Sequence, residues 1–156
     1  MANVDNPHGF QYERRTSGNG VPPMVTMQAQ TNTAIAAGDP VVVGTDGYLT
    51  VASATSAQLF GVAAHAITAA TGTYKDVMVI AALPDVVFSG QCSGDAQRTR
   101  IGEQVDIEGS TGIFEINEDA SSIDVLQIVG LKPGSAWGTN AELLFIIRES
   151  QYAGTT

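Results

Sequence analysis

Positive charge is scarce in this chain of 156 residues. Seven Lys and Arg residues stand against 16 Asp and Glu residues, which gives a net charge of −9 and a pI near 4.3. Proteins that bind nucleic acid through its phosphates need clustered basic side chains, because these release counterions from the backbone. We therefore predict no nucleic-acid partner.

Long apolar runs and paired cysteines are also missing. The run Val77–Leu83 has seven apolar residues and ends at Pro84, whereas a helix needs about 20 to cross a bilayer. Met1–His8 has neither the basic nor the apolar region of a signal peptide. We therefore expect no membrane partner, and synthesis and retention in a cytoplasm or in a particle assembled there. Cys92 has no second cysteine for a disulfide, and we expect it to be a buried apolar filler.

Local signatures of catalysis are absent from the sequence. It contains no Gly-x-Ser-x-Gly nucleophile elbow, no P-loop and no dinucleotide-binding glycine pattern. The two histidines, His8 and His65, lie far apart in the sequence, and we interpret His65 as a half-buried structural residue. We predict no catalytic residue, no metal ion and no cofactor.

Acidic residues supply the only raw material for other chemistry. Carboxylates that could approach one another on adjacent strands are Glu103, Asp106, Glu108 and Glu115. A glycosidase needs two such groups in a cleft, but aromatic residues make up only 6% of the chain and Trp137 is its single tryptophan. Asn117–Asp119 offers oxygen ligands of the kind that calcium prefers, without the spacing of an EF-hand. We interpret the acidic residues as a solvated face and leave the two other hypotheses open.

Short β-branched stretches separated by turn signals fill residues 25–149. The strongest local signal is a hairpin, in which Val41–Val43 and Tyr48–Val51 flank Thr45–Gly47, because an Asp-Gly pair readily adopts positive φ. Gly38–Pro40 is a second turn signal. We expect further strands at Val25–Ala29, Asn32–Gly38, Leu59–Ala63, Asp76–Ala81, Val86–Ser89, Gln104–Ile107, Gly112–Ile116, Val125–Val129 and Ala141–Arg148. Turn signals every 8–12 residues or so predict an all-β barrel or sandwich.

Residues 1–24 and 150–156 differ from this core. The first segment contains Pro7, Pro22 and Pro23 and has no sustained periodicity, so we predict an extended N-terminal arm. Aromatic and arginine side chains are the residues that anchor interfaces. The arm's candidate partner-binding residues are Phe10, Tyr12, Arg14, Arg15 and Met24. Packing of the arm on its own domain remains the alternative. The last seven residues are predicted to be a flexible tail.

Three stretches resemble the capsid decoration, or cement, proteins of tailed bacteriophages. They are the opening Met1–Phe10, the turn and strand Ala36–Val43 followed by Phe60–Ala63, and the region from Gly102–Ile107 to Val125–Leu131. The resemblance implies a compact β-barrel or β-tulip-like domain of short antiparallel strands with an extended N-terminal arm. It also implies a structural virion protein, without enzymatic activity, that acts on the capsid exterior.

The same resemblance implies partners. Such proteins commonly form homotrimers on the expanded capsid, where they bridge neighbouring copies of the major capsid protein and stabilise the head against internal DNA pressure. Two other functions stay open. One is a tail, fibre or host-adhesion module that binds carbohydrate through Trp137 or tyrosines. The other is a hydrolase built on a pair of carboxylates.

Overall fold

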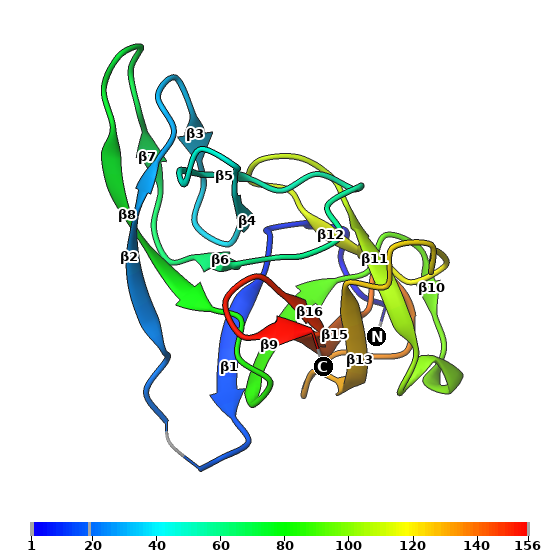
Figure 1. The fold of residues 1–156 in the computed structure, drawn as a ribbon. Helices are drawn as coiled ribbons and strands as arrows, with labels where there is room; N and C mark the ends of the chain where they lie inside the picture. The colour runs from blue at the N-terminus through cyan, green and yellow to red at the C-terminus, as the bar shows by residue number, and fades with distance from the viewer. Residues whose placement is uncertain (1, 19, 156) are drawn as a thin grey trace.

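The computed structural model describes residues 2–18 and 20–155, and it confirms a compact all-β fold. Within these residues the only helix is the short 3-10 turn η1 (Arg98–Arg100). Figure 1 shows a small barrel above a curled sheet, with the barrel strand β8 running down towards the sheet. Strand β12 ends at Asn117, and a non-helical turn follows it.

The first body is a closed five-stranded barrel in the order β2-β5-β4-β6-β8. Its strands are β2 (Met24–Ala29), β4 (Pro40–Val43), β5 (Leu49–Val51), β6 (Gly61–Ala63) and β8 (Lys75–Ala81). All neighbouring strands are antiparallel except β2 and β5. The predicted hairpin is confirmed as β4–β5, and Gly47 at its tip has φ 84°. The barrel encloses a small core around Val41, Leu49, Val77 and Val79.

The second body is a six-stranded sheet in the order β1-β9-β15-β13-β11-β12. Its strands are β1 (Gln11–Arg15), β9 (Val86–Gln91), β11 (Gln104–Glu108), β12 (Glu115–Asn117), β13 (Leu126–Leu131) and β15 (Glu142–Ile147). The sheet curls until β12 returns to the end of β9, where Cys92 bridges to Ile116 and the Ser93 N–H donates to the Ile116 carbonyl at 3.0 Å. Within this curl, Phe145 packs against Phe10 and Phe88 with ring centroids 4.8 and 5.9 Å apart.

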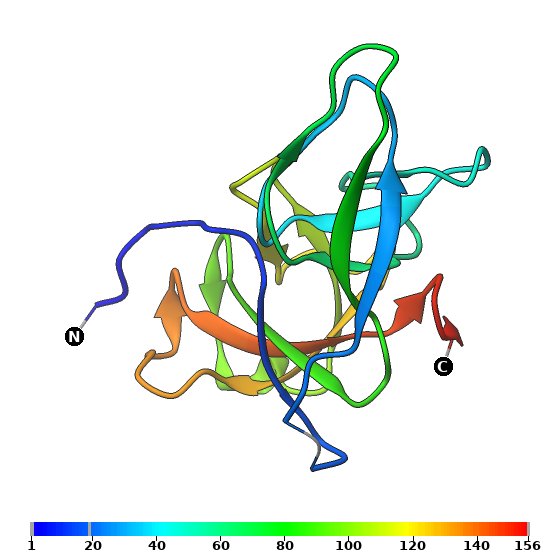
Figure 2. The ribbon, with the colours of Figure 1, turned by 90° about the vertical axis from the view of Figure 1, so that its left-hand side faces the viewer.

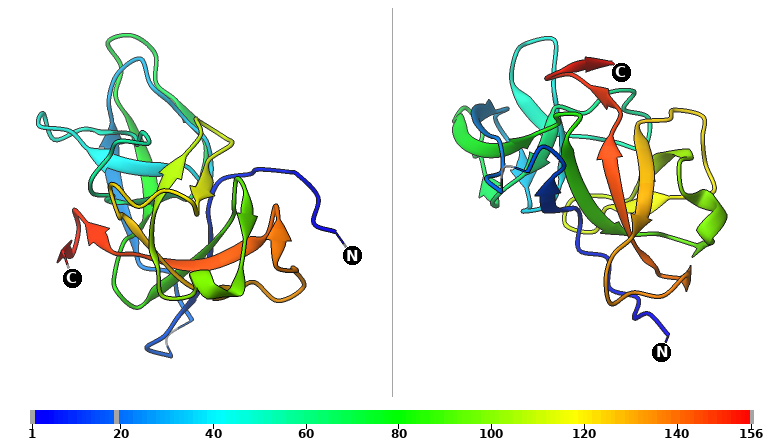
Figure 3. Two further views of the ribbon diagram at one scale, coloured as in Figure 1. Left: turned by 90° about the vertical axis from the view of Figure 1, so that its right-hand side faces the viewer. Right: turned by 90° about the horizontal axis from the view of Figure 1, so that it is seen from below.

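Three two-stranded pairs complete the fold. They are β3 (Ala34–Ile35) with β7 (Ile67–Thr68), β10 (Asp95–Ala96) with β14 (Gly138–Thr139), and β16 (Glu149–Ser150) with β17 (Gly154–Thr155). The strand expected at Asn32–Gly38 is confirmed only over β3, and the other five strands were not predicted, because strands of two residues carry no measurable periodicity. The two ends of the chain lie on opposite sides of the molecule (Figures 2 and 3).

The N-terminal segment differs from the predicted arm. Phe10 is 1% exposed and lies in the core of the sheet, and the next five residues form β1, which pairs with β9. The core therefore begins well before residue 25. The physical reason is that an aromatic ring is more stable when it is buried in the core than when it is exposed to water on a free arm. Met1 and Asn19 lie outside the described residues.

The C-terminal segment also differs from the predicted flexible tail. Ser150 is buried, and its hydroxyl donates to the Ala82 carbonyl at 2.7 Å. The same oxygen accepts the backbone N–H groups of Tyr152 and Ala153 at 3.0 and 2.9 Å. One buried serine thus holds the turn between β16 and β17 against the barrel. Thr156 lies outside the described residues.

The turn before β4 joins the two bodies and the N-terminal segment. The Phe10 N–H donates to the Gly38 carbonyl, and the Gly38 N–H donates to the Ala63 carbonyl, both at 2.8 Å. Asp39 is fully buried, and its carboxylate accepts N–H groups from Ala36 at 2.9 Å and from Gly112 at 2.8 Å. Burial raises the pKa of Asp39, although these two hydrogen bonds favour the charged form. Two of the stretches that carry the resemblance, Met1–Phe10 and Ala36–Val43, therefore meet at this turn.

Replacing Gly38 is expected to destabilise the contact between this turn and the N-terminal segment. Gly38 has φ +92°, and a Cβ there would lie 3.0 Å from the Phe10 carbonyl oxygen and 3.1 Å from that of His8. Strain at such a position costs about 1–3 kcal/mol. We expect Gly38→Ala to lower the free energy of unfolding by about 2–3 kcal/mol in denaturant titration. Gly102 has φ +91° with open space around it, so Gly102→Ala is the matched control for backbone strain alone. Equal losses of unfolding free energy in the two variants would contradict a close contact between Gly38 and the His8–Phe10 backbone.

Candidate binding groove between the sheet and the barrel

A groove of about 330 Å³ separates β1 from the barrel. Its side towards the sheet is formed by the segment from His8 to Tyr12, and its barrel side by the turn before β4 and by β2, β6 and β8. The barrel-side residues are Met24, Ala37, Gly38, Ala63, Ala64 and Ile80. Most of the lining side chains are apolar or small. The groove is therefore suited to apolar contacts rather than to the binding of a charged ligand.

Three of the five predicted partner-binding residues lie together in this groove. Phe10 is buried against the sheet core, Tyr12 is half-buried, and Met24 is 42% exposed. Alternation along β2 explains Met24, because Val25 and Met27 are more buried than the residues on either side of them. The barrel wall, in particular Ile80 and Ala63, was not assigned to a site from the sequence, since only the tertiary structure brings β6 and β8 beside β1.

The two predicted arginines have different environments. Arg14 is exposed on β1. Arg15 is held within the chain, because its Nε donates to Asp85 Oδ2 at 2.8 Å and its second guanidinium nitrogen lies 3.3 Å from Oδ1. Hydrogen bonds from Arg15 and Ser17 hold the pKa of Asp85 below its usual range. Arg14 is thus the arginine whose exposure suits a partner contact.

The strand beside the groove has an open edge. Among the described strands β1 pairs only with β9, at Gln11–Ser89, Tyr12–Phe88, Arg14–Val87 and Arg15–Val86. The register shifts between Tyr12 and Arg14, which leaves Glu13 at an irregularity. An unpaired strand edge offers backbone N–H and C=O groups to an extended segment of another chain. The groove and this edge together form a surface that can receive such a segment.

The carboxylates considered for catalysis occupy different environments. Asp106 is 5% exposed and accepts backbone N–H groups from Ser122, Ile123 and Asp124 at 3.3, 2.9 and 2.8 Å, and the Ser122 hydroxyl at 3.0 Å. Burial alone would raise its pKa, but these hydrogen bonds outweigh burial and lower it. Glu103 pairs with Arg100 at 2.9 Å. Asp106 therefore holds the loop at 122–124, and Glu103 holds η1.

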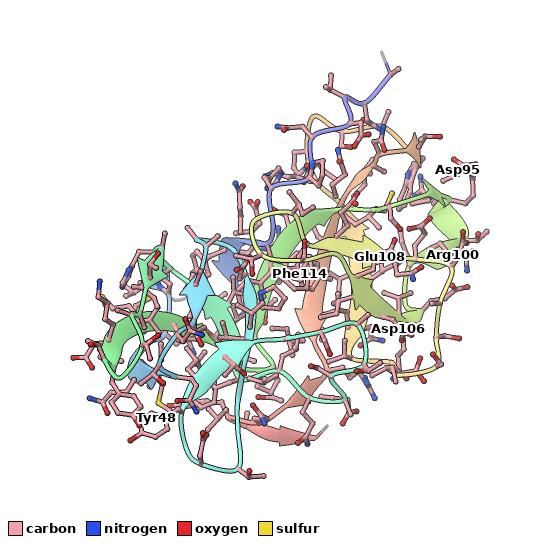
Figure 4. All side chains as sticks on the ribbon, turned by 90° about the horizontal axis from the view of Figure 1, so that it is seen from above. Tyr48, Asp95, Arg100, Asp106, Glu108 and Phe114 are labelled. Carbon is pink, nitrogen blue, oxygen red and sulfur yellow. The ribbon has the colours of Figure 1, made fainter. Side chains whose placement is uncertain are left out.

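The remaining acidic residues gather around β12. Glu108 and Glu115 face each other across β11 and β12, and Figure 4 places Glu108 in the same part of the molecule as Asp106 and Arg100. Burial raises the pKa of Glu115, and the nearby charges of Asp5, Glu108 and Glu118 raise it further. A carboxyl group whose pKa is raised in this way is suited to act as a general acid. Within the described part of the chain, however, no group of three or more His, Cys, Asp or Glu residues could hold a metal ion.

The proposed calcium loop is also arranged differently from a cation site. Glu118 is buried, its Oε2 accepts the Gly94 N–H at 3.3 Å, and burial raises its pKa. Asp119 instead pairs with Arg100 at 2.6 Å. Glu118 thus contacts a backbone N–H and Asp119 contacts an arginine, so both carboxylates hold the loop in place.

Cys92 and His65 have structural contacts. Cys92 is a free and fully buried thiol, as predicted, and burial raises its pKa to about 11. His65 is exposed rather than half-buried, and its Nε2 accepts the Met78 N–H at 3.1 Å. This contact continues the pairing of β6 with β8 by one residue, through a side chain.

Across residues 2–18 and 20–155, no helix is both long enough and apolar enough to span a membrane.

Comparison with known proteins adds no relative. No model of a protein family matches the chain, and no curated protein matches it either.

Proposed function

We propose that this chain is a structural virion protein of a tailed bacteriophage, which binds the outer surface of the expanded capsid and joins neighbouring major capsid protein subunits. The observation that carries the proposal is the groove beside β1, where Tyr12 and the exposed Met24 lie next to an open strand edge. A protein that stabilises a shell needs such an adhesive surface and no reaction centre. The sequence resemblance to decoration proteins supplies the identity of the partner.

The proposed contact is an extended segment of the major capsid protein that adds to β1. Backbone hydrogen bonds to the strand edge provide affinity, and an apolar side chain in the groove provides specificity. Arg14, exposed on the same strand, is placed to pair with an acidic group of the shell. Phe10 contributes from within the core, by fixing the position of β1.

A homotrimer would strengthen this attachment. Three grooves acting together raise the effective concentration of each, so a modest single contact gives a stable complex. The acidic surface, with a net charge of −9 per chain, limits non-specific adhesion to DNA. We propose the capsid exterior as the location of this trimer.

The test measures binding of the purified protein to empty expanded heads that lack it. We expect saturable binding of the wild type, and binding at least about tenfold weaker for Met24→Glu, because a charge would have to be desolvated in the groove. Ile101→Glu is the matched control, since Ile101 is 45% exposed against 42% for Met24 and does not line the groove. Equal affinities for the two variants would contradict docking through the groove.

One observation favours a second candidate, a carbohydrate-binding module of a tail or fibre. Tyr48 and Tyr74 stack at 4.2 Å between ring centroids with an interplanar angle of 15°, and Tyr74 is 45% exposed. Aromatic faces are the usual platforms for sugar rings. Trp137, by contrast, packs against the core. Immunolabelling of virions separates the candidates: label on the head supports a decoration protein, and label on the tail overturns it.

A further inference from the structure

The N-terminal residues Ala2–His8, here called the clasp, occupy a site built by the sheet. Asn3 makes the most specific contact. Its Nδ2 donates to the carbonyls of Ala136 and Thr139 at 2.8 and 3.0 Å. Its Oδ1 accepts the Ala136 N–H at 3.1 Å and the Ser135 hydroxyl at 3.2 Å. The loop at 135–139 therefore recognises a side-chain amide with both donors and two acceptor contacts satisfied.

Two further contacts fix the path of the clasp. The Gln91 amide on β9 donates from Nε2 to the Val4 carbonyl at 2.7 Å and accepts the Asn6 N–H on Oε1 at 3.0 Å. At the end of the clasp, His8 Nε2 lies 2.8 Å from Glu142 Oε1 on β15. The site thus recognises an amide, a backbone segment and an imidazole at fixed spacing along an extended chain.

Apolar burial contributes little to this attachment. Val4 is 77% exposed, and a cavity of about 600 Å³ lies along the clasp between it and the loop at 132–135. His8 Nδ1 and Glu142 Oε2 are buried without a hydrogen-bond partner. Figure 2 shows the clasp running outward from the body of the molecule, and Figure 4 shows it at the same end of the molecule as Asp95. A segment held by directional contacts at an edge can leave its site without exposing a core.

The connection to the core permits an alternative path. Gly9, with φ +78°, separates the clasp from Phe10, which is anchored in the core and bonded to Gly38. A glycine in this region gives the chain a choice of directions that other residues lack. Displacement of Ala2–His8 therefore leaves β1 and Phe10 in place.

We propose that the clasp of one copy docks into the clasp site of a second copy of this chain. The site fits the spacing of Asn3, Asn6 and His8, and a second copy is the partner that carries this same segment. Each hydrogen bond that opens within one chain forms again between the two chains, so exchange changes the free energy little apart from the cost of association. A chain concentration at the roughly millimolar level of a short tether offsets that cost, in solution as in an assembly, and both tests below are run at that level. The proposal does not depend on what the groove beside β1 binds.

The test divides the His8–Glu142 contact between two chains by placing an oppositely charged pair, Glu at position 8 and Arg at position 142, on different copies. In His8→Glu the introduced carboxylate faces Glu142, and in Glu142→Arg the introduced guanidinium faces His8, which has no carboxylate to offer it, so each variant loses this contact within its own chain. In a mixture, each clasp finds its matching site only on the other variant. The neighbouring Lys132 is neutralised by Glu13 at 2.9 Å and does not offset the exchange. The experiment runs at about 0.15 M salt, where the Debye length is about 8 Å and general repulsion between acidic chains is screened.

We expect tagged His8→Glu to recover at least about tenfold more untagged Glu142→Arg than untagged His8→Glu, because matched charges across an interface select partners. The double variant His8→Glu/Glu142→Arg restores the pair within one chain and should unfold at the wild-type temperature, which shows that the substitutions leave the fold intact. Equal recovery of the two untagged variants overturns the proposal.

A second measurement uses the wild type and does not rely on charge reversal. Tagged wild-type chain should recover untagged wild-type chain, and recovery should fall when both chains carry Asn3→Ala. Val4→Ala is the control, since Val4 is exposed within the same segment. If Asn3→Ala chains associate as well as the wild type, the contact between copies does not use the clasp. Binding to capsids is measured separately, so failure here leaves the proposed function standing.

Discussion

Replacing Phe10 by alanine is expected to lower the free energy of unfolding by about 3–5 kcal/mol, the range for removing a buried phenylalanine. Phe10 is 1% exposed and packs edge-on against Phe145 at 4.8 Å. The cavity left by its ring lies where β1 meets β9 and β15. Because these strands are hydrogen-bonded to one another, we expect the surrounding residues to relax little into the cavity. For a domain of this size the loss corresponds to a fall in Tm of roughly 6–20 °C. Thermal unfolding followed by circular dichroism provides the measurement.

The same experiment distinguishes a packed segment from a free arm. Val4→Ala is the control within the same segment, and we expect it to change the free energy of unfolding by less than about 0.5 kcal/mol because Val4 is exposed. A Phe10→Ala variant as stable as the wild type would restore the free arm that the sequence predicted. Deletion of residues 1–24 removes Phe10 and β1 together, so a deletion variant tests folding as well as capsid binding. Point substitutions such as Met24→Glu are the sharper probe of the groove.

Replacing Asp106 by alanine is the second change with a large expected effect. Its carboxylate accepts four hydrogen bonds and is 5% exposed. Hydrogen bonds to a charged group contribute roughly 1.5–3 kcal/mol each, and the loss also leaves donors unpaired. Because the four bonds share one group and are not additive, we expect a total loss of about 3–5 kcal/mol in denaturant titration. Asp106→Asn keeps one acceptor oxygen and should lose less.

The effect of Asp106 should also depend on pH in a defined direction. Its pKa is lowered in the folded protein, so the unfolded chain binds the proton more readily. The stabilisation is therefore fully present above the ordinary aspartate pKa, and it is lost as pH falls through the lower folded value. Wild type and Asp106→Ala should accordingly converge in stability at acid pH. Asp76→Ala, at an exposed position on β8, is the control and should follow the wild type throughout. A constant difference at all pH values would contradict the role given to the charged form.

Much of the barrel was predictable from local sequence. The β4–β5 hairpin and the turn at Gly38 follow from residues within about ten positions of one another, and both signals arise from backbone preferences of Gly, Asp and Pro. The barrel strands at 24–29 and 75–81, and the sheet strand at 142–147, follow from short stretches rich in apolar and β-branched residues. The strand expected at Gly112–Ile116 is present as β12, but it begins at Glu115 rather than at Gly112. Element boundaries shift in this way because pairing partners decide where a strand begins.

The site depended on contacts that local patterns do not contain. Tyr12, Met24 and Phe10 were selected as anchors for their residue types, and the structure places all three at one groove. Their selection did not reveal that Phe10 faces inward, since an aromatic residue flanked by glycine and polar residues looks the same on an arm and on a strand. The choice of these residues also did not reveal that Ile80 lines the barrel side of the groove. In the sequence, Asp106 also looks equivalent to Glu103. Only the tertiary structure places the backbone N–H groups of residues 122–124 around the Asp106 carboxylate.

The amino-acid sequence by itself determined the all-β class, the hairpin turns, the acidic charge and the absence of local catalytic signatures. The tertiary structure decided which residues meet: that β1 joins the sheet, that the segment Ala2–His8 lies against the loop at 135–139, and that Ser150 secures the chain end. The reason is physical. Turn and strand preferences act over a few bonds, whereas these contacts join residues up to 136 positions apart. Their free energy comes from burial and hydrogen bonding that exist only once the sheet has curled.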